Sequence, residues 1–576
     1  MNILGLNFFH ADSAACLIVN GKIIAAIEEE RFDRIKHSDS FPINSIKFCL
    51  EIGKLRLEDI NYVAVNFNNN YNLKEKIFFL SKNLFTKSIY KKINNFLKKK
   101  KLYNFFLKNF NFNLKTNKIE IVYVPHHLAH IASTTFTFNI KNGLAFSFDG
   151  SGDFSTTEVY KIKNEQYNLI EKTIYPHSLG IFYQMFTQFL GFTHYGDEYK
   201  MMGLAAYGDP VFEDRVRKIL KKGKSFINLN LNFFKHHLDI FSYGDSVNYT
   251  KTLYSDLIEN VFGKPRKKNE PIAKLHKDIA ASVQKVFEDT VLLKIKNLYE
   301  EYPSENLCLS GGCAFNSVLL GKIKNYSIFK NVYVSCNAGD AGGALGAALF
   351  VCNKYDQIVE NDKDLLNPFL GSFFSNEYIG NRIVPLAKAI NCEFLLYQNE
   401  DKLLEFVTEE ICQGKVVGWH QGRSEWGPRA LGNRSILADP RNPNMRDIIN
   451  DKIKKREEFR PFAPSVLEEH ASTYFYMNGQ SPYMGFVFDA KQIAKDKIPS
   501  CVHVDGTSRV QTVNLEFNKR FYKLISIFHK KTGVPILLNT SLNVNEPICN
   551  SPEDAWKVFS QTYMDTLVLE DWVFFK

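Results

Sequence analysis

The sequence predicts a soluble α/β protein of two domains, the first of which contains two related lobes. Chain length is one indication, because 576 residues exceed what a single hydrophobic core usually organises. A strand–polar turn–strand pattern also occurs at the N-terminus and again near residue 144. Finally, composition changes over 351–375, where polar residues and Pro368 indicate a linker. We therefore expect domains at 1–355 and 376–576.

The N-terminal segment is predicted to form three strands. Ile3–Phe9 is an apolar run typical of a buried strand, and Ala15–Val19 and Lys22–Ile27 follow it as a hairpin. The dipeptide Asn20-Gly21 between the last two favours a tight two-residue turn.

The same pattern predicts the second lobe. Leu144–Phe148 is apolar, Asp149–Asp153 is an acidic turn containing glycine, and Thr156–Lys161 alternates as a returning strand does. Actin-like and sugar-kinase-like nucleotide folds are built from two such lobes, each presenting a hairpin turn to a shared cleft. The first domain is therefore expected to bind a nucleotide.

Two glycine-rich turns support that expectation. Each follows a predicted strand: Leu307–Ser310 precedes Gly311-Gly312, and Val332–Ser335 precedes the run Asn337–Gly346. Backbone N–H groups at such strand–helix junctions can hold an anion.

His126 and His130 are the most informative pair in the chain. Pro125 suits the first position of a helix, and residues four apart lie on one helical face. Two imidazoles so placed can share a divalent metal ion. An ion needs further ligands, and Asp340, in the second glycine-rich turn, is the candidate oxygen donor. Without that segment, a helix surface or a hydrogen-bonded core pair would explain the histidines.

The second domain carries the densest arginine block of the chain. Its first convincing strand is Val416–Trp419. Seven arginines follow among glycines and prolines rather than at helical spacing: Arg423, Arg429, Arg434, Arg441, Arg446, Arg456 and Arg460. Guanidinium groups bind phosphates and carboxylates through two parallel hydrogen bonds, so the block predicts a pocket for an anionic substrate. Nucleic-acid binding is the alternative, against which interleaved acids such as Glu425 and Asp439 argue.

The lysine-rich segment 71–118 accounts for the positive charge of the chain. It holds 13 lysines and one acid, Glu75, so its net charge of +12 leaves −2 for the remainder out of a total of +10. Interleaved Phe, Leu and Ile would allow contact with nucleic acid or an anionic membrane surface. A solvated helical insertion is the simpler interpretation.

Composition argues against several other classes. The chain is 45% apolar and 23% charged, as globular proteins usually are, and no uncharged apolar run approaches about 18 residues, which argues against a membrane span. The N-terminus lacks the basic region and cleavage site of a signal peptide. Ten scattered cysteines without a C-x-x-C pair indicate reduced thiols. We expect a cytoplasmic protein.

Long motifs from most of the chain resemble those of the ATP-dependent O-carbamoyltransferases that modify antibiotics and nodulation factors. The matching motifs are Asn7–Ala15, Glu28–His37, His126–His130, Tyr195–Gly208, Ser310–Asn316, Asn337–Gly346, Glu425–Asp439, Lys455–Pro464, Asp505–Arg509 and Thr532–Asn543. So many motifs in one order identify the sequence as a member of this family. It departs from some members in one place, because Ala11 separates His10 from Asp12.

The resemblance implies a fold for each domain and a two-step reaction. Residues 1–355 are similar to an actin-like (ASKHA) domain related to tRNA threonylcarbamoyltransferases, with 71–118 as an insertion. Residues 376–576 are similar to the threonylcarbamoyl-adenylate synthase (YrdC-like) fold. Carbamoyl phosphate and ATP, with Mg²⁺, would form carbamoyl-AMP in the second domain. The carbamoyl group would then pass to a hydroxyl of a small-molecule or glycan acceptor in the first. A homodimer is compatible with the resemblance, and no stable nucleic-acid partner is expected.

The resemblance also implies roles for individual residues. His126, His130 and Asp340 would hold Fe²⁺ or another divalent ion. His10, Asp12, Arg423 and Lys455 would be catalytic, the first two by binding or deprotonating the acceptor hydroxyl. Contacts to nucleotide and phosphate are expected from Asp149, Gly150, Gly311, Gly312, Asn316, Gly342, Gly343, Arg423, Arg429, Arg434, Arg509 and Asn539.

Two alternatives belong to other classes. A threonylcarbamoyltransferase acting on tRNA would use 71–118 to contact RNA, but it would not need the arginine-rich second domain. A binding protein that kept the fold and lost the chemistry would not need the intact His, Asp and Arg sets. The sequence does not identify the acceptor.

Overall fold

The computed structural model describes residues 1–82, 102–223, 226–239, 251–326, 328–355 and 366–576, and the chain divides into two compact units. Unit 1 contains Met1–Asn316 and Ser327–Leu366, and unit 2 contains Ser317–Tyr326 and Asn367–Lys576. The second unit therefore includes a helix, α12 (Ser317–Tyr326), from the last part of the predicted first domain.

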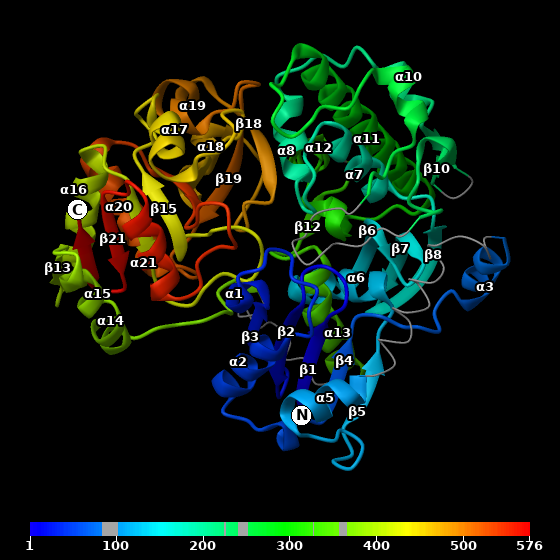
Figure 1. Ribbon diagram of the computed structural model, residues 1–576, viewed down its shortest axis with the longest axis horizontal. Helices are drawn as coiled ribbons and strands as arrows, with labels where there is room; N and C mark the ends of the chain where they lie inside the picture. The colour runs from blue at the N-terminus through cyan, green and yellow to red at the C-terminus, as the bar shows by residue number, and fades with distance from the viewer. Residues whose placement is uncertain (83–101, 224–225, 240–250, 327, 356–365) are drawn as a thin grey trace. The chain divides into compact units, whose positions relative to one another are not determined.

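Unit 1 is built on two five-stranded sheets with the same strand order (Figure 1). In the first, β3-β2-β1-β4-β5, β1 pairs antiparallel with β2 and parallel with β4. Its strands are β1 Asn2–Asn7, β2 Ala14–Val19, β3 Lys22–Glu28, β4 Tyr62–Val65 and β5 Glu120–Tyr123. The expected hairpin turn is present, since Asn20 and Gly21 both have positive φ, 48° and 82°.

The second sheet repeats this arrangement in the order β12-β11-β6-β7-β8. Here β6 pairs antiparallel with β7 and parallel with β11. Its strands are β6 Asn142–Gly152, β7 Ser155–Lys163, β8 Gln166–Ile174, β11 Asn306–Ser310 and β12 Asn331–Val334. The shared order and pairing confirm the predicted pair of related α/β lobes.

Two equivalent helices join the lobes. Helix α6 (His126–Thr137) follows the last strand of the first sheet, and α13 (Asp340–Lys354) follows the last strand of the second. They pack on one another, and α13 also lies against β1, β2 and β4. A Cβ at Gly346 would lie 1.8 Å from the carbonyl oxygen of Ala129, and one at Gly5 would lie 2.2 Å from that of Ala344. Only residues without side chains allow these approaches.

The lysine-rich segment is described only at its ends. Helix α3 (Leu73–Lys82) precedes residues 83–101, which lie outside the described part of the chain, and α5 (Leu102–Phe110) follows them. Among the described helices, none combines the length and apolar character that a membrane crossing requires.

Unit 2 is organised by one ten-stranded sheet in the order β13-β22-β21-β14-β15-β20-β16-β19-β18-β17. Its strands are β13 Glu393–Leu396, β14 Val417–His420, β15 Arg434–Ala438, β16 Ala463–Leu467, β17 Phe475–Tyr476, β18 Phe486–Ala490, β19 Thr507–Val513, β20 Ile536–Ser541, β21 Thr566–Leu569 and β22 Trp572–Phe575. The strand expected at Val416–Trp419 is confirmed as β14.

Helices cover this sheet through apolar faces. Helix α20 (Lys519–Thr532) buries Phe521, Leu524, Ile525 and Phe528, the helical spacing of an amphipathic face, and packs against α16 (Glu400–Cys412). Helix α12 packs on β18, and a Cβ at Gly321 would lie 1.8 Å from the carbonyl oxygen of Val487.

The α6–α13 contact predicts whether a glycine substitution there raises or lowers the free energy of unfolding. Gly→Ala inside a helix usually stabilises by about 0.5–1 kcal/mol. Gly346→Ala should instead lower the free energy of unfolding by about 1–3 kcal/mol, because its Cβ meets the Ala129 carbonyl. Denaturant unfolding measures the change, and Gly485→Ala is the control, since its Cβ would meet nothing within 4 Å. Equal effects of the two substitutions would contradict the packing argument.

Candidate functional site

The residues before and beside the first turn of α6 hold its histidines in place. Pro125 precedes the helix, and the backbone N–H of His126 donates to Asp153 Oδ2 at 2.9 Å, which caps the helix N-terminus. A Cβ at Gly152 would lie 2.0 Å from the His126 ring. Glycine at that position therefore leaves the room that the imidazole occupies.

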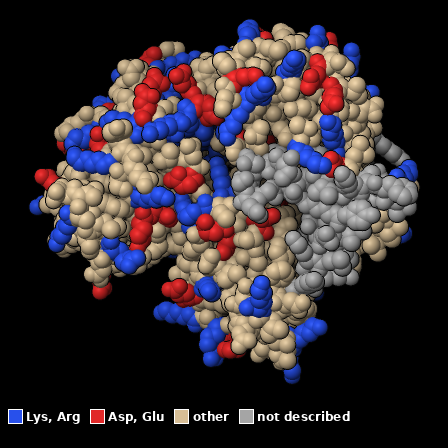
Figure 2. Space-filling view, in the orientation of Figure 1, with Lys and Arg blue, Asp and Glu red and all other residues tan. Residues whose placement is uncertain are grey.

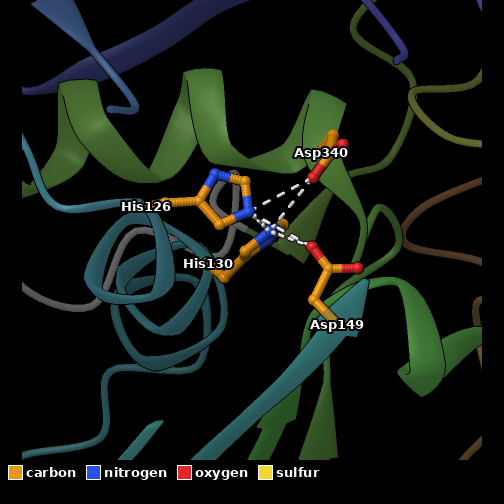
Figure 3. Close-up of side chains that lie close together, drawn as sticks. All are labelled: His126, His130, Asp149 and Asp340. Atoms are coloured by element: carbon orange, nitrogen blue, oxygen red, sulfur yellow. Dashed lines mark hydrogen bonds and ion pairs between the residues drawn. The ribbon is translucent and has the colours of Figure 1, made fainter. Parts of the chain in front are cut away.

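Four side chains from three elements converge in unit 1 (Figure 3). His130 Nε2 lies 3.0 Å from His126 Nε2. Asp149 Oδ2, from β6, lies 3.2 Å from His126 Nε2 and 3.4 Å from His130 Nε2. Asp340 Oδ1, from the first residue of α13, lies 3.4 and 3.3 Å from the same nitrogen atoms. We refer to these four residues as the His/Asp cluster.

The spacing of the His/Asp cluster suits one divalent ion. Ligand atoms about 2.1 Å from a common ion are roughly 3.0 Å apart in octahedral and roughly 3.4 Å apart in tetrahedral geometry. The five separations given above fall between 3.0 and 3.4 Å. The donor set of two imidazoles and two carboxylates could therefore hold a divalent metal.

The charges of the His/Asp cluster also favour a cation. Burial lowers the pKa of His126 to about 3, with a further contribution from His130. Burial also acts to lower the pKa of His130, but hydrogen bonds to Asp149 and Asp340 prevail and raise it to about 9. The two imidazoles thus share one proton at neutral pH, beside two carboxylates. Burial opposes ionisation of Asp149, yet hydrogen bonds from both histidines hold its pKa well below the usual range.

The structure brings His10 to the His/Asp cluster and directs Asp12 elsewhere. His10 Nδ1 lies 3.1 Å from Asp340 Oδ2, and the His10 ring centre lies 5.4 Å from that of His126. Asp12 Oδ1 instead pairs with His37 Nδ1 at 2.7 Å. His127 turns toward Ser147 Oγ, at 2.8 Å, and not toward the cluster. Of the two residues predicted to handle the acceptor hydroxyl, only His10 contacts a cluster residue.

The first glycine-rich turn is coupled to the His/Asp cluster through Asp149. Gly312 N–H donates to Asp149 Oδ1 at 3.0 Å, so one carboxylate contacts both the histidines and the turn. Gly311 has φ of 89°, and a Cβ there would lie 2.4 Å from the Phe148 carbonyl. A Cβ at Gly150 would meet nothing within 4 Å, so the β6 hairpin leaves open space beside the turn. The Asn316 amide pairs with Gln284 through two 3.0 Å hydrogen bonds.

Two predicted nucleotide contacts are packed closely against the protein. Gly342 and Gly343 lie in the first turn of α13 and are buried. A Cβ at Gly342 would lie 1.9 Å from the Asn337 carbonyl oxygen, and one at Gly343 would lie 2.4 Å from Asn66 Nδ2. Both positions therefore need glycine for packing, and their contact with a nucleotide stays a prediction.

Unit 2 gathers cations from separate segments. The members of this cationic cluster are Arg429, Lys454, Arg456, Arg460 and Arg509. Burial holds the pKa of the Arg509 guanidinium well below its usual range, and the three other arginines add to the effect. Burial, together with Arg456 and Arg460, likewise holds the pKa of the Lys454 ammonium well below its usual range. Like charges that depress one another's pKa would be stabilised by a bound anion, so the anionic-substrate pocket stays a prediction for these residues.

The surface in Figure 2 carries a mixture of charges, unlike the cationic cluster. Figure 2 shows Lys and Arg interleaved with Asp and Glu over the described surface of this face, so no single-sign patch covers it. The concentration of positive charge in unit 2 is therefore a property of the cationic cluster and not of the whole face.

Lys455, predicted to be catalytic, lies beside a buried lysine that the sequence pattern did not single out. Lys455 is exposed and has φ of 44°, whereas Lys454 is buried. Lys454 Nζ donates to the Ser541 carbonyl and, at 2.7 Å, to Asn543 Oδ1. The sequence pattern missed Ser541 and Asn543 as well, although both lie within the matching motif that ends at Asn543.

The guanidinium groups of Arg434 and Arg423 donate hydrogen bonds to backbone carbonyls. All three guanidinium nitrogens of Arg434 donate to carbonyl oxygens, among them those of Gln421 at 2.7 Å and Ser372 at 2.9 Å. Arg423 donates to the carbonyls of Gly371 and Leu370. The prediction that Arg434 binds phosphate is therefore corrected, because the side chain is fully buried and clamps the loop instead. Arg423 likewise anchors the 370–371 segment. Asn539, by contrast, is buried on β20, in the same sheet as β19, the strand that carries Arg509 of the cationic cluster.

Both units correspond to described protein families. Residues 2–349 match the family model "Carbamoyltransferase N-terminus", and residues 408–576 match "Carbamoyltransferase C-terminus". The chain therefore belongs to the carbamoyltransferase family, which confirms the resemblance seen in the sequence.

Relatives extend over nearly the full length. The chain is 37% identical to an uncharacterized protein of Synechocystis sp., across 100% of this chain and 97% of that protein. It is 35% identical to nodulation protein NolNO of Sinorhizobium fredii, across 98% of this chain and 78% of the relative.

Solved structures are more distant. Component A of (R)-2-hydroxyglutaryl-CoA dehydratase from Acidaminococcus fermentans has a TM-score of 0.33 at 13% identity, over 62% of this chain and 98% of that chain. HypF from T. kodakarensis has a TM-score of 0.32 at 14% identity, over 63% of this chain and 49% of that chain.

The His/Asp cluster predicts the effect of removing one imidazole. His126→Ala or His130→Ala should reduce bound divalent metal from about one ion per chain to near zero, because each substitution removes one of four ligands. Elemental analysis of the purified full-length protein measures the stoichiometry. His529→Ala, in α20 of unit 2, is the matched control. Full metal content in both cluster variants would show that the ion binds elsewhere.

Metal affinity at this site should depend on pH in one direction. Below pH 9 the cluster carries the proton on His130, and an ion must displace it. Apparent affinity should therefore rise about tenfold per pH unit as pH increases toward 9, then level off. Competition with a calibrated chelator at several pH values measures the slope. A flat profile between pH 6 and 9 would contradict the shared-proton arrangement.

The cationic cluster predicts that one substitution changes the melting temperature in opposite directions with and without a bound anion. Arg509→Met should raise the melting temperature in anion-free buffer, because it relieves repulsion, and should abolish most of the stabilisation by added pyrophosphate. Arg509→Lys keeps the charge but loses the planar fork, so its pyrophosphate response should also fall. Arg446→Met, which removes a partner of Asp447, is the control. An unchanged pyrophosphate response in Arg509→Met would place the anion site elsewhere.

Proposed function

We propose that this protein is an ATP-dependent O-carbamoyltransferase that forms carbamoyl-AMP in unit 2 and transfers its carbamoyl group to a hydroxyl in unit 1. The observation that carries the proposal is the His/Asp cluster, whose 3.0–3.4 Å separations suit a divalent ion in a chain of the carbamoyltransferase family. The cationic cluster of unit 2 supplies the second, anion-binding centre that a two-step reaction requires. Unit 1 would then be of the actin-like type and unit 2 of the threonylcarbamoyl-adenylate synthase type.

The first step needs a strongly positive pocket. Carbamoyl phosphate, ATP and one water give carbamoyl-AMP, phosphate and pyrophosphate: water releases carbamate and phosphate, and a carbamate oxygen then displaces pyrophosphate from the α-phosphorus. Negative charge accumulates on pyrophosphate as that bond breaks. Arg456 and Arg509 are the groups we assign to hold these phosphates, because Arg509 is buried near Arg456 with its Nε unpaired among the described residues. Lys454, whose Nζ donates to Ser541 and Asn543, would hold that segment in place. Mg²⁺ would accompany ATP.

The second step needs an orienting centre. A hydroxyl oxygen attacks the carbamoyl carbonyl, the bond to the AMP phosphate oxygen breaks, and the hydroxyl proton must leave. His126, His130, Asp149 and Asp340 would hold Fe²⁺ or another divalent ion, which supplies Lewis-acid stabilisation of the adenylate phosphate. Gly312, whose N–H is aligned by Asp149, and the open space at Gly150 would receive the nucleotide. His10, oriented by Asp340, is the side chain we assign to the acceptor's proton.

The acceptor class follows from the chemistry. A small molecule or glycan that offers a hydroxyl is proposed, as is a cytoplasmic location, where ATP and carbamoyl phosphate are available. An assembly of two copies is compatible with the proposal and is not required by it.

The proposal is tested by separating the two steps in the full-length protein. We expect carbamoyl-phosphate-dependent release of pyrophosphate from ATP, and a gain of one carbamoyl group by mass on a member of a panel of glycans and hydroxylated metabolites. His126→Ala should retain pyrophosphate release and lose transfer, whereas Arg509→Met should lose both. Pyrophosphate release that does not depend on carbamoyl phosphate would reject the proposal. Salt-sensitive retardation of tRNA at physiological ionic strength would favour threonylcarbamoyl transfer instead.

Point variants are preferred to isolated halves for a structural reason. A fragment 376–576 would lack α12, which packs on β18, and the segment bearing the Ser372 carbonyl to which Arg434 donates. A fragment 1–350 would carry α12 without its sheet. Loss of activity in either piece would therefore report unfolding as readily as mechanism.

A further inference from the structure

Asn539 is a buried amide whose NH₂ group has hydrogen-bond partners and whose oxygen has none among the described residues. It lies on β20 with 1% of its surface exposed. Its Nδ2 lies within hydrogen-bonding distance of Ser465 Oγ at 2.9 Å, Gln511 Oε1 at 3.1 Å and the Ala430 carbonyl at 3.2 Å. Its Oδ1 has no hydrogen-bond partner among the described residues. A buried amide oxygen left in this state costs free energy, so the position calls for a donor.

The orientation of this amide is set by its neighbours. Gln511 Nε2 donates to the Leu431 carbonyl at 2.8 Å, so Gln511 must turn its Oε1 toward Asn539. That oxygen also accepts from Ser465 Oγ at 2.6 Å. Asn539 can meet these acceptors and the Ala430 carbonyl only with its NH₂ group. Its oxygen therefore faces away from the network.

Strand alternation places this oxygen on the sheet face that carries the cationic cluster. Asn539 and Ser541 are two residues apart on β20, so their side chains share a face. Ser541 contacts Lys454 Nζ through its carbonyl and, at 3.3 Å, its Oγ. On β19, Gln511 shares a face with Arg509 in the same way. Asn539, Ser465 and Gln511 are hydrogen-bonded to one another across the neighbouring strands β20, β16 and β19, so the three side chains share one face. The Lys454 contacts of Ser541 and the side chain of Arg509 belong to that same face by strand alternation.

We propose that Asn539 Oδ1 accepts a hydrogen bond from the carbamoyl NH₂ group and thereby selects carbamoyl phosphate over other acyl phosphates. This rests on the proposed function. Phosphate oxygens need donors, and the cationic cluster offers donors only. A carbamoyl group carries two N–H bonds and so needs an acceptor at the opposite end of the same small molecule. Asn539 supplies an unpaired buried acceptor on the sheet face that also bears Arg509 and the Lys454 contacts of Ser541, and a donor set with an acceptor is the polarity that this molecule presents.

Acetyl phosphate is the discriminating probe. It has the same phosphate and carbonyl, with a methyl group in place of NH₂, so it would leave Asn539 Oδ1 without a donor. A site built around a hydrogen bond rejects the analogue that lacks it, because the buried group stays unpaired. The wild-type protein should therefore bind carbamoyl phosphate at least about tenfold more tightly than acetyl phosphate.

The test compares both acyl phosphates in the full-length protein at saturating ATP. KM for carbamoyl phosphate is measured from pyrophosphate release, and Ki for acetyl phosphate from its competition. Asn539→Leu should collapse the preference to within about twofold, chiefly by weakening carbamoyl phosphate, and Asn539→Asp, which keeps an acceptor oxygen, should retain more of it. Thermal-shift titration with each acyl phosphate gives the same ratio without turnover, so a failure of the proposed reaction is seen separately.

Ser465→Ala is the matched control. It removes one partner of Nδ2 and leaves Oδ1 untouched, so it should affect both acyl phosphates in parallel and preserve their ratio. A parallel loss in Asn539→Leu would show that Asn539 only supports the sheet. Weakened ATP binding with an unchanged ratio would assign the oxygen to the adenine amine. A wild-type protein that does not prefer carbamoyl phosphate would overturn the proposal outright.

Discussion

The close contact between α6 and α13 is the constraint on which unit 1 depends. Because Gly346 lets α13 reach the Ala129 carbonyl, the first turns of two helices from different lobes lie together. His126 and Asp340 occupy those first turns, and the β6 hairpin adds Asp149. Helix N-termini carry partial positive charge, which helps to hold the carboxylates ionised and prepares the site for a phosphate. A larger residue at 346 would separate the ligands as well as the helices.

The two units bury charge in opposite ways. In unit 1 two carboxylates surround a pair of imidazoles that carries one positive charge, on His130, and in unit 2 several cations repel one another. Each arrangement is least stable when alone and gains most from a ligand of opposite sign. Stability is thus given up at these positions, which is typical of functional sites.

Sequence reasoning predicted those features that depend on local periodicity. The His126–His130 pair follows from helical spacing, and the lobes follow from two strand–turn–strand patterns. Asp149 was assigned to phosphate alone because only the placement of β6 beside α6 shows its contact with both histidines. The sequence pattern did not single out Lys454, because local periodicity does not show the π-helical turn at Asn450–Lys454 that changes the direction of successive side chains. The carbonyl partners of Arg434 come from distant loops, so composition could not distinguish a clamp from a pocket.

The path of the chain limits how this family can be recombined. The backbone leaves unit 1 after Asn316, returns after Tyr326 and leaves again after Leu366, so three connections join the units. A gene fusion at a single junction cannot exchange one unit for another. A chimaera with a new acceptor specificity in unit 1 would have to keep the α12 sequence of the recipient's unit 2, including Gly321 opposite Val487. Diversity among relatives is therefore expected to accumulate by substitution within each unit and seldom by swapping whole halves.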